Sequence, residues 1–70
     1  MTAQEAFDAG GQAHLRGDYA GAERLYRLAA ELDARHVDCR LNLGILLRAT
    51  GHPEEARAAL EEGLALASSA

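Results

Sequence analysis

Apolar residues recur at helical spacing along most of the chain, and two stripes of them are clear. One stripe lies in residues 19–32 and the other in the last stretch of the chain, after residue 53. Their members are Ala22, Leu25, Tyr26 and Ala29 in the first stripe, and Ala56, Ala59, Leu60, Gly63 and Leu64 in the second. Spacings of three and four place such residues on one face of a helix, which would then face inward. We therefore expect an all-α chain.

Signals for the starts and ends of helices divide the chain into four. Thr2 followed three residues later by Glu5 is typical of a capping box at a helix start. Gly17 and Gly51 can each take the left-handed backbone conformation that commonly ends a helix. Pro53 suits the first turn of a helix because its φ is already fixed there. The helices are predicted over residues 3–15, 19–32, 37–49 and 53 to about the end of the chain.

An internal period of 34 residues relates the two halves of the chain. Four pairs of identical residues stand at this offset: Gly10 and Gly44, Gly17 and Gly51, Ala22 and Ala56, and Leu32 and Leu66. The chain is therefore predicted to be one domain over residues 1–70 that holds two copies of a helical hairpin, over about 3–36 and 37–70. Short loops make neighbouring helices antiparallel.

Gly10 and Gly44 fall inside predicted helices, where a glycine costs about 1 kcal/mol relative to alanine. Their shared place in both copies indicates a packing need, so we expect the partner helix to approach closely there. Ala22 and Ala56 are the small residues expected to face them from that helix.

These spacings resemble the tetratricopeptide repeat family, whose pattern W-x2-L-G-x2-Y, then A-x3-F, then P recurs every 34 residues. The second copy reads Arg40-x2-Leu43-Gly44-x2-Leu47 and then Ala56-x3-Leu60, and the first reads Ala6-x2-Ala9-Gly10-x2-Ala13 and then Ala22-x3-Tyr26. The chain departs from the pattern at the Trp position, with Ala6 and Arg40, and at the closing Pro position, with Ala34 and Ser68. The resemblance implies two antiparallel helix-turn-helix repeats in a short right-handed solenoid that acts as a non-catalytic protein-binding module.

The resemblance also implies which residues bind the partner. In this family the first helix of each repeat lines a concave face that holds an extended peptide or a helix of another protein. The corresponding residues here are Phe7, Gly11 and His14, with Gln4 and Leu15 beside them, and Leu41, Asn42, Ile45 and Arg48, with Asp38 and Ala49 beside them. An equally weighted alternative is that Phe7, Leu41 and Ile45 only pack against one another between the repeats.

One well-known subset of the family clamps a C-terminal carboxylate with Lys, Asn and Arg on this face. The chain has no Lys, and Asn42 alone stands where a clamp asparagine would lie. Phe7 and Gly11 occupy the matching positions of the first repeat. We therefore do not expect this clamp.

Two repeats leave more apolar surface than they can cover, because repeats of this kind bury their apolar faces against neighbours. The predicted helix over residues 37–49 is apolar almost all round. The last helix carries the candidate residues of a self-association face, which are Leu60, Leu64 and Leu66. Three explanations stay open: the chain forms a homo-oligomer, it is part of a longer array, or it folds alone with an apolar groove for a partner.

Composition and charge narrow the classes of function. The formal net charge of −4 argues against nucleic acid as a partner. All seven basic residues are Arg, which is a bacterial-like composition. The single cysteine, Cys39, cannot form an intramolecular disulfide and favours a reducing compartment. No apolar run approaches the roughly 20 residues of a membrane span, and the first residues do not resemble a secretory signal. We expect a cytoplasmic protein with no membrane contact.

Residues suited to chemistry are few. His36 and Cys39 stand three apart and could share a helix face, but two ligands do not make a metal site. A buried, inert Cys39 is the preferred interpretation. No nucleophile is accompanied by its base, and no phosphate-binding loop follows a strand. We therefore expect no enzyme activity, no metal and no cofactor.

Overall fold

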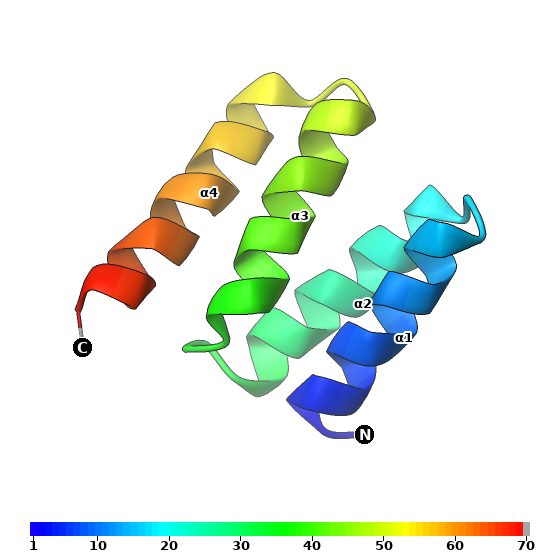
Figure 1. Cartoon of the computed structure of the whole chain (residues 1–70), viewed down its shortest axis with the longest axis horizontal. Coiled ribbons are helices and arrows are strands. Elements are labelled where there is room, and N and C mark those ends of the chain that lie inside the picture. The colour runs from blue at the N-terminus through cyan, green and yellow to red at the C-terminus, as the bar shows by residue number, and fades with distance from the viewer. Residues whose placement is uncertain (70) are drawn as a thin grey trace.

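The computed structural model describes residues 1–69 of the chain (Figure 1). In this range it contains four helices and no strand, in the order α1 Ala3–Leu15, α2 Tyr19–Leu32, α3 Val37–Ala49 and α4 Pro53–Ser68. The all-α prediction and the four predicted helices are confirmed. The predicted end of the second repeat, at residue 70, lies outside the described residues.

The helices begin and end where the local signals place them. The side chain of Thr2 accepts a hydrogen bond from the backbone N–H of Glu5 at 3.1 Å, and the Glu5 carboxylate accepts one from the backbone N–H of Thr2 at 2.8 Å. This is the predicted capping box, and the backbone N–H and then the side chain of Thr2 lower the pKa of Glu5 below its ordinary value. Gly17 and Gly51 take left-handed backbone angles, with φ of 81° and 88°, just after α1 and α3.

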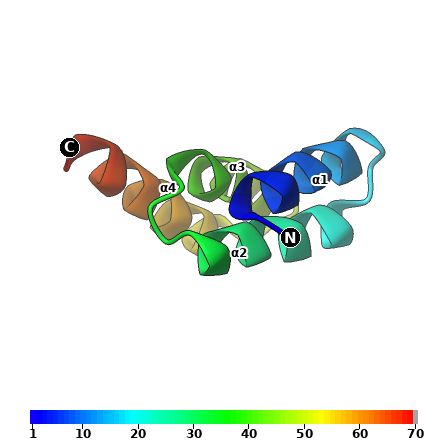
Figure 2. The same ribbon diagram turned by 90° about the horizontal axis from the view of Figure 1, so that it is seen from below.

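The helices form two hairpins that pack side by side. α1 and α2 make the first hairpin and α3 and α4 the second, and the two helices of each hairpin are antiparallel and in close contact (Figure 1). The hairpins are joined mainly by contacts of α2 with α3. α1 and α3 lie toward one side of the molecule and α2 toward the other (Figure 2). The first helices of the two hairpins therefore share a face.

The main core cluster contains residues of all four helices, and its largest buried side chains come from α2 and α3, which are in contact. Tyr26 of α2 is 1 % exposed, and Leu46 and Leu47 of α3 are 0 % and 2 % exposed in the same cluster. Burying a large apolar side chain is worth about 1.5–3 kcal/mol, so this contact is what holds the hairpins together. A second, smaller cluster consists of Ala6, Ala29 and Cys39.

His36 ties the start of α3 to α1. Its Nδ1 atom accepts a hydrogen bond from the backbone N–H of Cys39 at 3.1 Å, which makes it the N-cap of α3. Its Nε2 atom lies 3.2 Å from the side-chain oxygen of Gln4, and its ring centroid lies 5.0 Å from that of Phe7. The neutral tautomer with its proton on Nε2 satisfies both hydrogen bonds. One side chain thus starts a helix and holds the second hairpin against the first.

Gly10 and Gly44 are points of close packing, as predicted. A Cβ atom on Gly10 would lie 2.7 Å from the ring of Tyr26, and one on Gly44 would lie 2.6 Å from the side chain of Leu60. Real Cβ atoms do not approach other atoms this closely, so neither position has room for a side chain. The two contacts are equivalent, because Tyr26 and Leu60 stand at the same place in the two hairpins.

The prediction that small residues face these glycines is confirmed for Ala56 at Gly44, but the nearest atoms in both contacts belong to Tyr26 and Leu60. Ala22 is buried in the main core, and Ala56 approaches Gly44 with its backbone oxygen, at 3.1 Å from the position of a Cβ atom. The physical reason is steric. A large side chain on the facing helix requires a glycine opposite it, whereas an alanine opposite would leave room for a Cβ atom on both helices.

The second hairpin leaves apolar side chains uncovered. Ile45 of α3 is 48 % exposed and Leu64 of α4 is 60 % exposed, whereas Leu60 is half-buried. The prediction that Leu64 belongs to the inward stripe of α4 is therefore wrong, although the two alanines and Gly63 of that stripe are buried. None of the described helices lies over this side of α4, so a leucine there stays in solvent.

Candidate binding face

A hollow lies between the hairpins on the face that α1 and α3 share. Its volume is about 630 Å³. It is lined by residues of three helices: Phe7, Asp8, Gly11, Gln12, His14 and Leu15 from α1, Tyr26 from α2 and Asn42 from α3. The structure thus brings together four of the seven residues predicted to bind a partner, which are Phe7, Gly11, His14 and Asn42.

Aromatic rings form the floor of the hollow. The ring centroids of Phe7 and Tyr26 lie 5.9 Å apart, with the ring planes tilted by 38°. Phe7 also packs against His36, so its ring is held from two sides. Gly11 has no side chain above this floor, and the nearest atom to a Cβ atom there would be the Tyr26 hydroxyl oxygen, at an ordinary contact distance of 3.9 Å. Gly11 therefore keeps the hollow open and is not a close-packing point.

Polar side chains surround this floor. Gln12 and Asn42 carry amides that both donate and accept hydrogen bonds, and Asp8 carries a carboxylate that accepts them. His14 is half-buried, and its ring meets that of Tyr19 edge-on with centroids 5.5 Å apart. An apolar floor with a polar rim is the usual anatomy of a protein-binding surface.

Leu41, Ile45 and Arg48 do not line this hollow. Leu41 packs toward α4, where its side chain fills the space that a side chain on Gly63 would need. Ile45 is exposed on α3, and Arg48 lines a second hollow, between α3 and α4. The seven predicted residues therefore fall into two groups. Four of them line the hollow between the hairpins, and the other three face α4 or solvent.

The three residues of the predicted self-association face are also divided. Leu60 and Leu64 line the second hollow together with Arg48. Leu66 lies in a different hollow, beside Arg40 near the loop between the hairpins. Six residues correspond to about one and two-thirds turns of a helix, so Leu66 points away from the side that Leu60 and Leu64 share.

The sequence does not single out Tyr26 or His36 as part of the shared face. Tyr26 belongs to the predicted inward stripe of α2, and its contribution to the floor is visible only in the structure. The signal that could have found it is the Gly10-Gly11 pair, which removes two adjacent side chains from the helix opposite its ring. His36 is found only from the fold, because its contacts with Phe7 and Gln4 cross between the hairpins.

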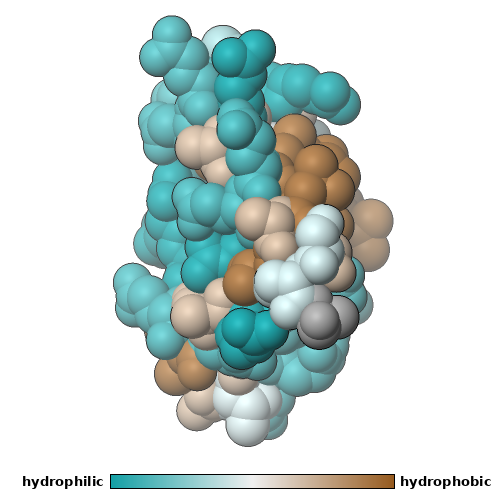
Figure 3. Space-filling model, turned by 90° about the vertical axis from the view of Figure 1, so that its left-hand side faces the viewer, coloured by the Kyte–Doolittle hydropathy of each residue, from teal (hydrophilic) through white to brown (hydrophobic). Residues whose placement is uncertain are grey.

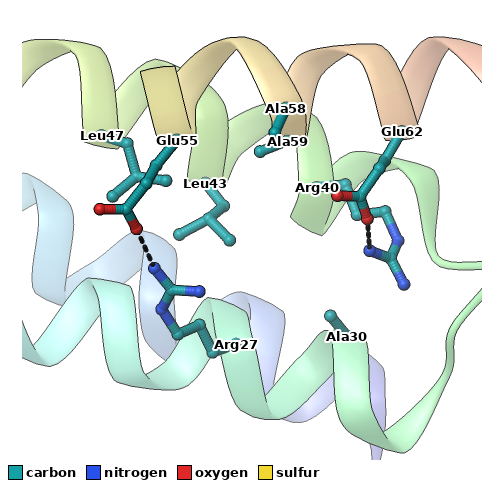
Figure 4. Close-up of a pocket in the computed structure, with 9 residues that line it drawn as sticks. All are labelled: Arg27, Ala30, Arg40, Leu43, Leu47, Glu55, Ala58, Ala59 and Glu62. Carbon is teal, nitrogen blue, oxygen red and sulfur yellow. Dashed lines mark hydrogen bonds and ion pairs between the residues drawn. The ribbon is translucent and has the colours of Figure 1, made fainter. Parts of the chain in front are cut away.

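A cleft along the seam between the hairpins is filled by contacts of the protein with itself. Arg27 of α2 pairs with Glu55 of α4 at 3.2 Å, and Arg40 of α3 pairs with Glu62 of α4 at 2.7 Å (Figure 4). The first of these pairs crosses from one hairpin to the other. Exposed ion pairs of this kind contribute about 0–1 kcal/mol each. Because these charged side chains pair with one another, we interpret the cleft as part of the contact between the repeats and not as a binding site.

The side chains of Cys39 and His36 are both held by contacts within the fold. Burial raises the pKa of the Cys39 thiol, and its Sγ atom donates a hydrogen bond to the backbone oxygen of His36 at 3.2 Å. Among residues 1–69, no three side chains that could ligate a metal come together. Over the same described range, no helix has the length and apolar character needed to cross a bilayer.

Comparison with protein-family models matches residues 13–69 to the tetratricopeptide repeat. The matched region runs from the last turn of α1 through α2, α3 and α4 to the end of the described chain. Among curated proteins and among solved structures, none matches the chain.

Proposed function

The chain belongs to the tetratricopeptide repeat family, and we propose that it is a binding module that holds an extended peptide or a helix of another protein against the face formed by α1 and α3. The hollow between the hairpins is the centre of this face. The function is one of binding alone, with no catalytic step and no cofactor.

The observation that carries the proposal is the open space over Gly11. A glycine inside a helix is less stable than an alanine by about 1 kcal/mol. Close packing does not require it here, because nothing lies nearer than 3.9 Å to the position of a Cβ atom. A side chain at this position would occupy the hollow that Phe7 lines and would lie near the Tyr26 hydroxyl. Glycine therefore leaves the hollow open, and the half-buried ring of Phe7 is its accessible apolar surface, since Tyr26 is only 1 % exposed.

The surroundings of the hollow suit two kinds of contact. The half-buried ring of Phe7 offers apolar surface to one large side chain of a partner. Asn42 carries both a donor and an acceptor, which suits the backbone of an extended peptide, and His14 lines the same hollow from α1. Ile45 extends the apolar surface along α3, whereas Leu41 and Arg48 would contact only a partner that also reaches α4.

Replacing Gly11 by leucine tests the proposal, because a leucine would fill the hollow and suits a helix. The purified chain is immobilised and used to capture proteins from an extract of its own organism, in three forms: unchanged, Gly11→Leu and Ala20→Leu. Ala20 is exposed on α2 and lies outside the hollow, which makes it a matched control. We expect a partner that the unchanged chain and the control retain equally and that Gly11→Leu binds at least about tenfold more weakly.

The captured protein is then purified and titrated into the isotope-labelled chain, and the backbone amide signals are followed by NMR. The amides of Gly11, Asn42 and their neighbours should move most. Circular dichroism establishes that each variant is folded before binding is measured. Equal affinity of Gly11→Leu and Ala20→Leu for the partner, or shifts that gather away from the hollow, would show the assignment to be wrong.

A further inference from the structure

The hydroxyl group of Tyr26 lies at the hollow over Gly11 without a hydrogen-bond partner. No hydrogen bond between residues 1–69 involves it, although Tyr26 is only 1 % exposed. Since no polar side-chain atom of this range is both fully buried and unbonded, the small exposed part of Tyr26 includes the hydroxyl. Tyr26 lines the hollow, and its hydroxyl oxygen is the atom nearest to the position of a Cβ atom on Gly11. The hydroxyl therefore opens into the hollow.

This hydroxyl limits which side chain of a partner can occupy the hollow. An entirely apolar side chain would cover the hydroxyl and leave it without a hydrogen bond, which is costly for a polar group that is withdrawn from water. The side chain that enters must therefore combine an apolar stem, for the half-buried ring of Phe7, with a polar end.

Asp8 sets the charge of the hollow. Of the described residues that line it, Asp8 is the only acid and none is a lysine or an arginine. Asp8 stands three residues before Gly11 on α1, so the two positions are neighbours on the surface of the helix. The Tyr26 hydroxyl lies 3.9 Å from the position of a Cβ atom on Gly11. The carboxylate and the hydroxyl thus border the same space, where a cation is favoured and an anion is repelled.

Hydrogen bonds that cross between the hairpins orient the Asp8 carboxylate. Its Oδ1 atom accepts a hydrogen bond from Nε2 of Gln4 at 3.0 Å, and Oε1 of Gln4 lies 3.2 Å from Nε2 of His36, the N-cap of α3. A carboxylate has about four acceptor sites, so Asp8 keeps sites for a ligand. An acid that is oriented in advance loses less conformational freedom on binding.

The hollow between α3 and α4 lacks this selectivity. The α4 side of the molecule shows hydrophobic residues gathered at one part of the surface, with hydrophilic residues over much of the rest (Figure 3). The charged side chains of the hollow are of both signs, Arg48 and Arg57 with Glu61. Because neither a cation nor an anion is favoured there, we propose no ligand for it.

We propose that the partner inserts a basic side chain, a lysine or an arginine, into the hollow over Gly11; this rests on the proposed function of the face. The aliphatic stem of that side chain lies on the ring of Phe7. Its cationic end donates hydrogen bonds to the Asp8 carboxylate and to the Tyr26 hydroxyl oxygen. A cation beside an aromatic ring adds an attraction of its own.

Selection of peptides tests the charge of the occupant. The whole chain is used at neutral pH to select binders from a displayed library of random short peptides. Peptides that Gly11→Leu also binds are removed, so that those remaining need the open hollow. We expect lysine or arginine to be enriched at one position of these peptides, and aspartate and glutamate to be depleted there.

Synthetic versions of one selected peptide measure the contribution of the charge. Norleucine in place of the basic residue keeps the stem and removes the cation, and glutamate reverses the charge. Isothermal titration calorimetry should show the norleucine peptide to bind at least about fivefold more weakly, and the glutamate peptide more weakly still. Added salt should weaken the basic peptide more than the norleucine peptide.

Two variants of the chain locate the contacts. Asp8→Asn and Tyr26→Phe should each weaken the basic peptide at least about threefold, and neither should weaken the norleucine peptide. Glu31→Gln is the matched control for loss of an acid, since Glu31 is exposed on α2 outside the hollow. Tyr26→Phe should also keep the urea midpoint of the chain, because the hydroxyl bonds to no other described group. Circular dichroism establishes that each variant is folded.

The possible failures separate this occupant from the proposed function. Peptides that need the open hollow but share no lysine or arginine would leave the proposed function standing and overturn the basic occupant alone. So would equal affinity for the basic and norleucine peptides, or a basic peptide whose affinity Asp8→Asn does not lower. A selection that yields no peptide dependent on the open hollow would overturn both.

Discussion

Adding one methyl group to α1 should have opposite effects at two neighbouring positions. In Gly10→Ala the new Cβ atom would lie 2.7 Å from the buried ring of Tyr26, so we expect a loss of about 1–3 kcal/mol in the free energy of unfolding. In Gly11→Ala the nearest atom is 3.9 Å away, and the higher helix propensity of alanine should add up to about 1 kcal/mol. Urea denaturation followed by circular dichroism, at one fixed protein concentration, measures both. If both variants changed the free energy of unfolding in the same direction, the roles assigned to Gly10 and Gly11 would be wrong.

At the scale of single residues, the sequence shows which positions are packed closely, but it does not show which side chains pack against them. The repeat of Gly10 at Gly44 was enough to predict two points of close packing, because a glycine inside a helix is costly and its recurrence needs a reason. It did not reveal that Tyr26 and Leu60 fill the space, since that depends on how two helices cross. In the same way, the sequence grouped Leu66 with Leu60, and the helical rotation between them separates the two.

At the level of the helices, local signals determined the boundaries. The capping box at Thr2 and the left-handed glycines at Gly17 and Gly51 act within a few residues, so their effect can be read without the fold. The start of α3 is different. His36 is not among the usual capping residues, and its ring is oriented by Gln4 on another helix. A cap that depends on tertiary contacts could not be predicted from the chain alone.

Two substitutions of His36 separate its local role from its role between the hairpins. His36→Ala removes the cap of α3 and the ring contact with Phe7, and should destabilise the fold by about 1–3 kcal/mol in total. His36→Asn keeps a side-chain oxygen that can accept the N–H of Cys39 but loses the ring. We expect its stability to lie between those of the unchanged chain and His36→Ala, as measured by thermal and urea denaturation. If the two variants were equally destabilised, the cap would contribute nothing.

On the scale of the whole molecule, the repeat architecture could be predicted but the candidate face only in part. A period of 34 residues defines the hairpins and their order. The groove residues came from the family resemblance position by position, which treats both hairpins alike. The structure makes them unlike, because α3 packs on α2 whereas none of the described helices covers α4 in the same way. For this reason Asn42 joins the residues of α1 at one hollow, and Arg48 lies at another with Leu60 and Leu64.

The contact between α2 and α3 should decide whether the whole chain folds. Leu46 of α3 is 0 % exposed in the core cluster that also contains Tyr26 of α2, and Leu46→Ala is expected to cost about 2–5 kcal/mol. A single core in a chain of this size rarely supplies more than about 3–5 kcal/mol, so the variant should be largely unfolded. Ile45→Ala is the control on the neighbouring residue, which is 48 % exposed, and should change stability by about 1 kcal/mol or less.

Amide hydrogen exchange, read residue by residue, shows whether the two hairpins unfold together in Leu46→Ala. Neither hairpin buries enough apolar surface by itself, because each uses the other as part of its core. We therefore expect protection to fall equally in α1, at one end of the molecule, and in α4, at the other. Protection that persists in α1 and α2 while α3 and α4 exchange freely would mean that the first hairpin is stable alone. The α2–α3 contact would then add the second hairpin to an existing fold and would not create the fold.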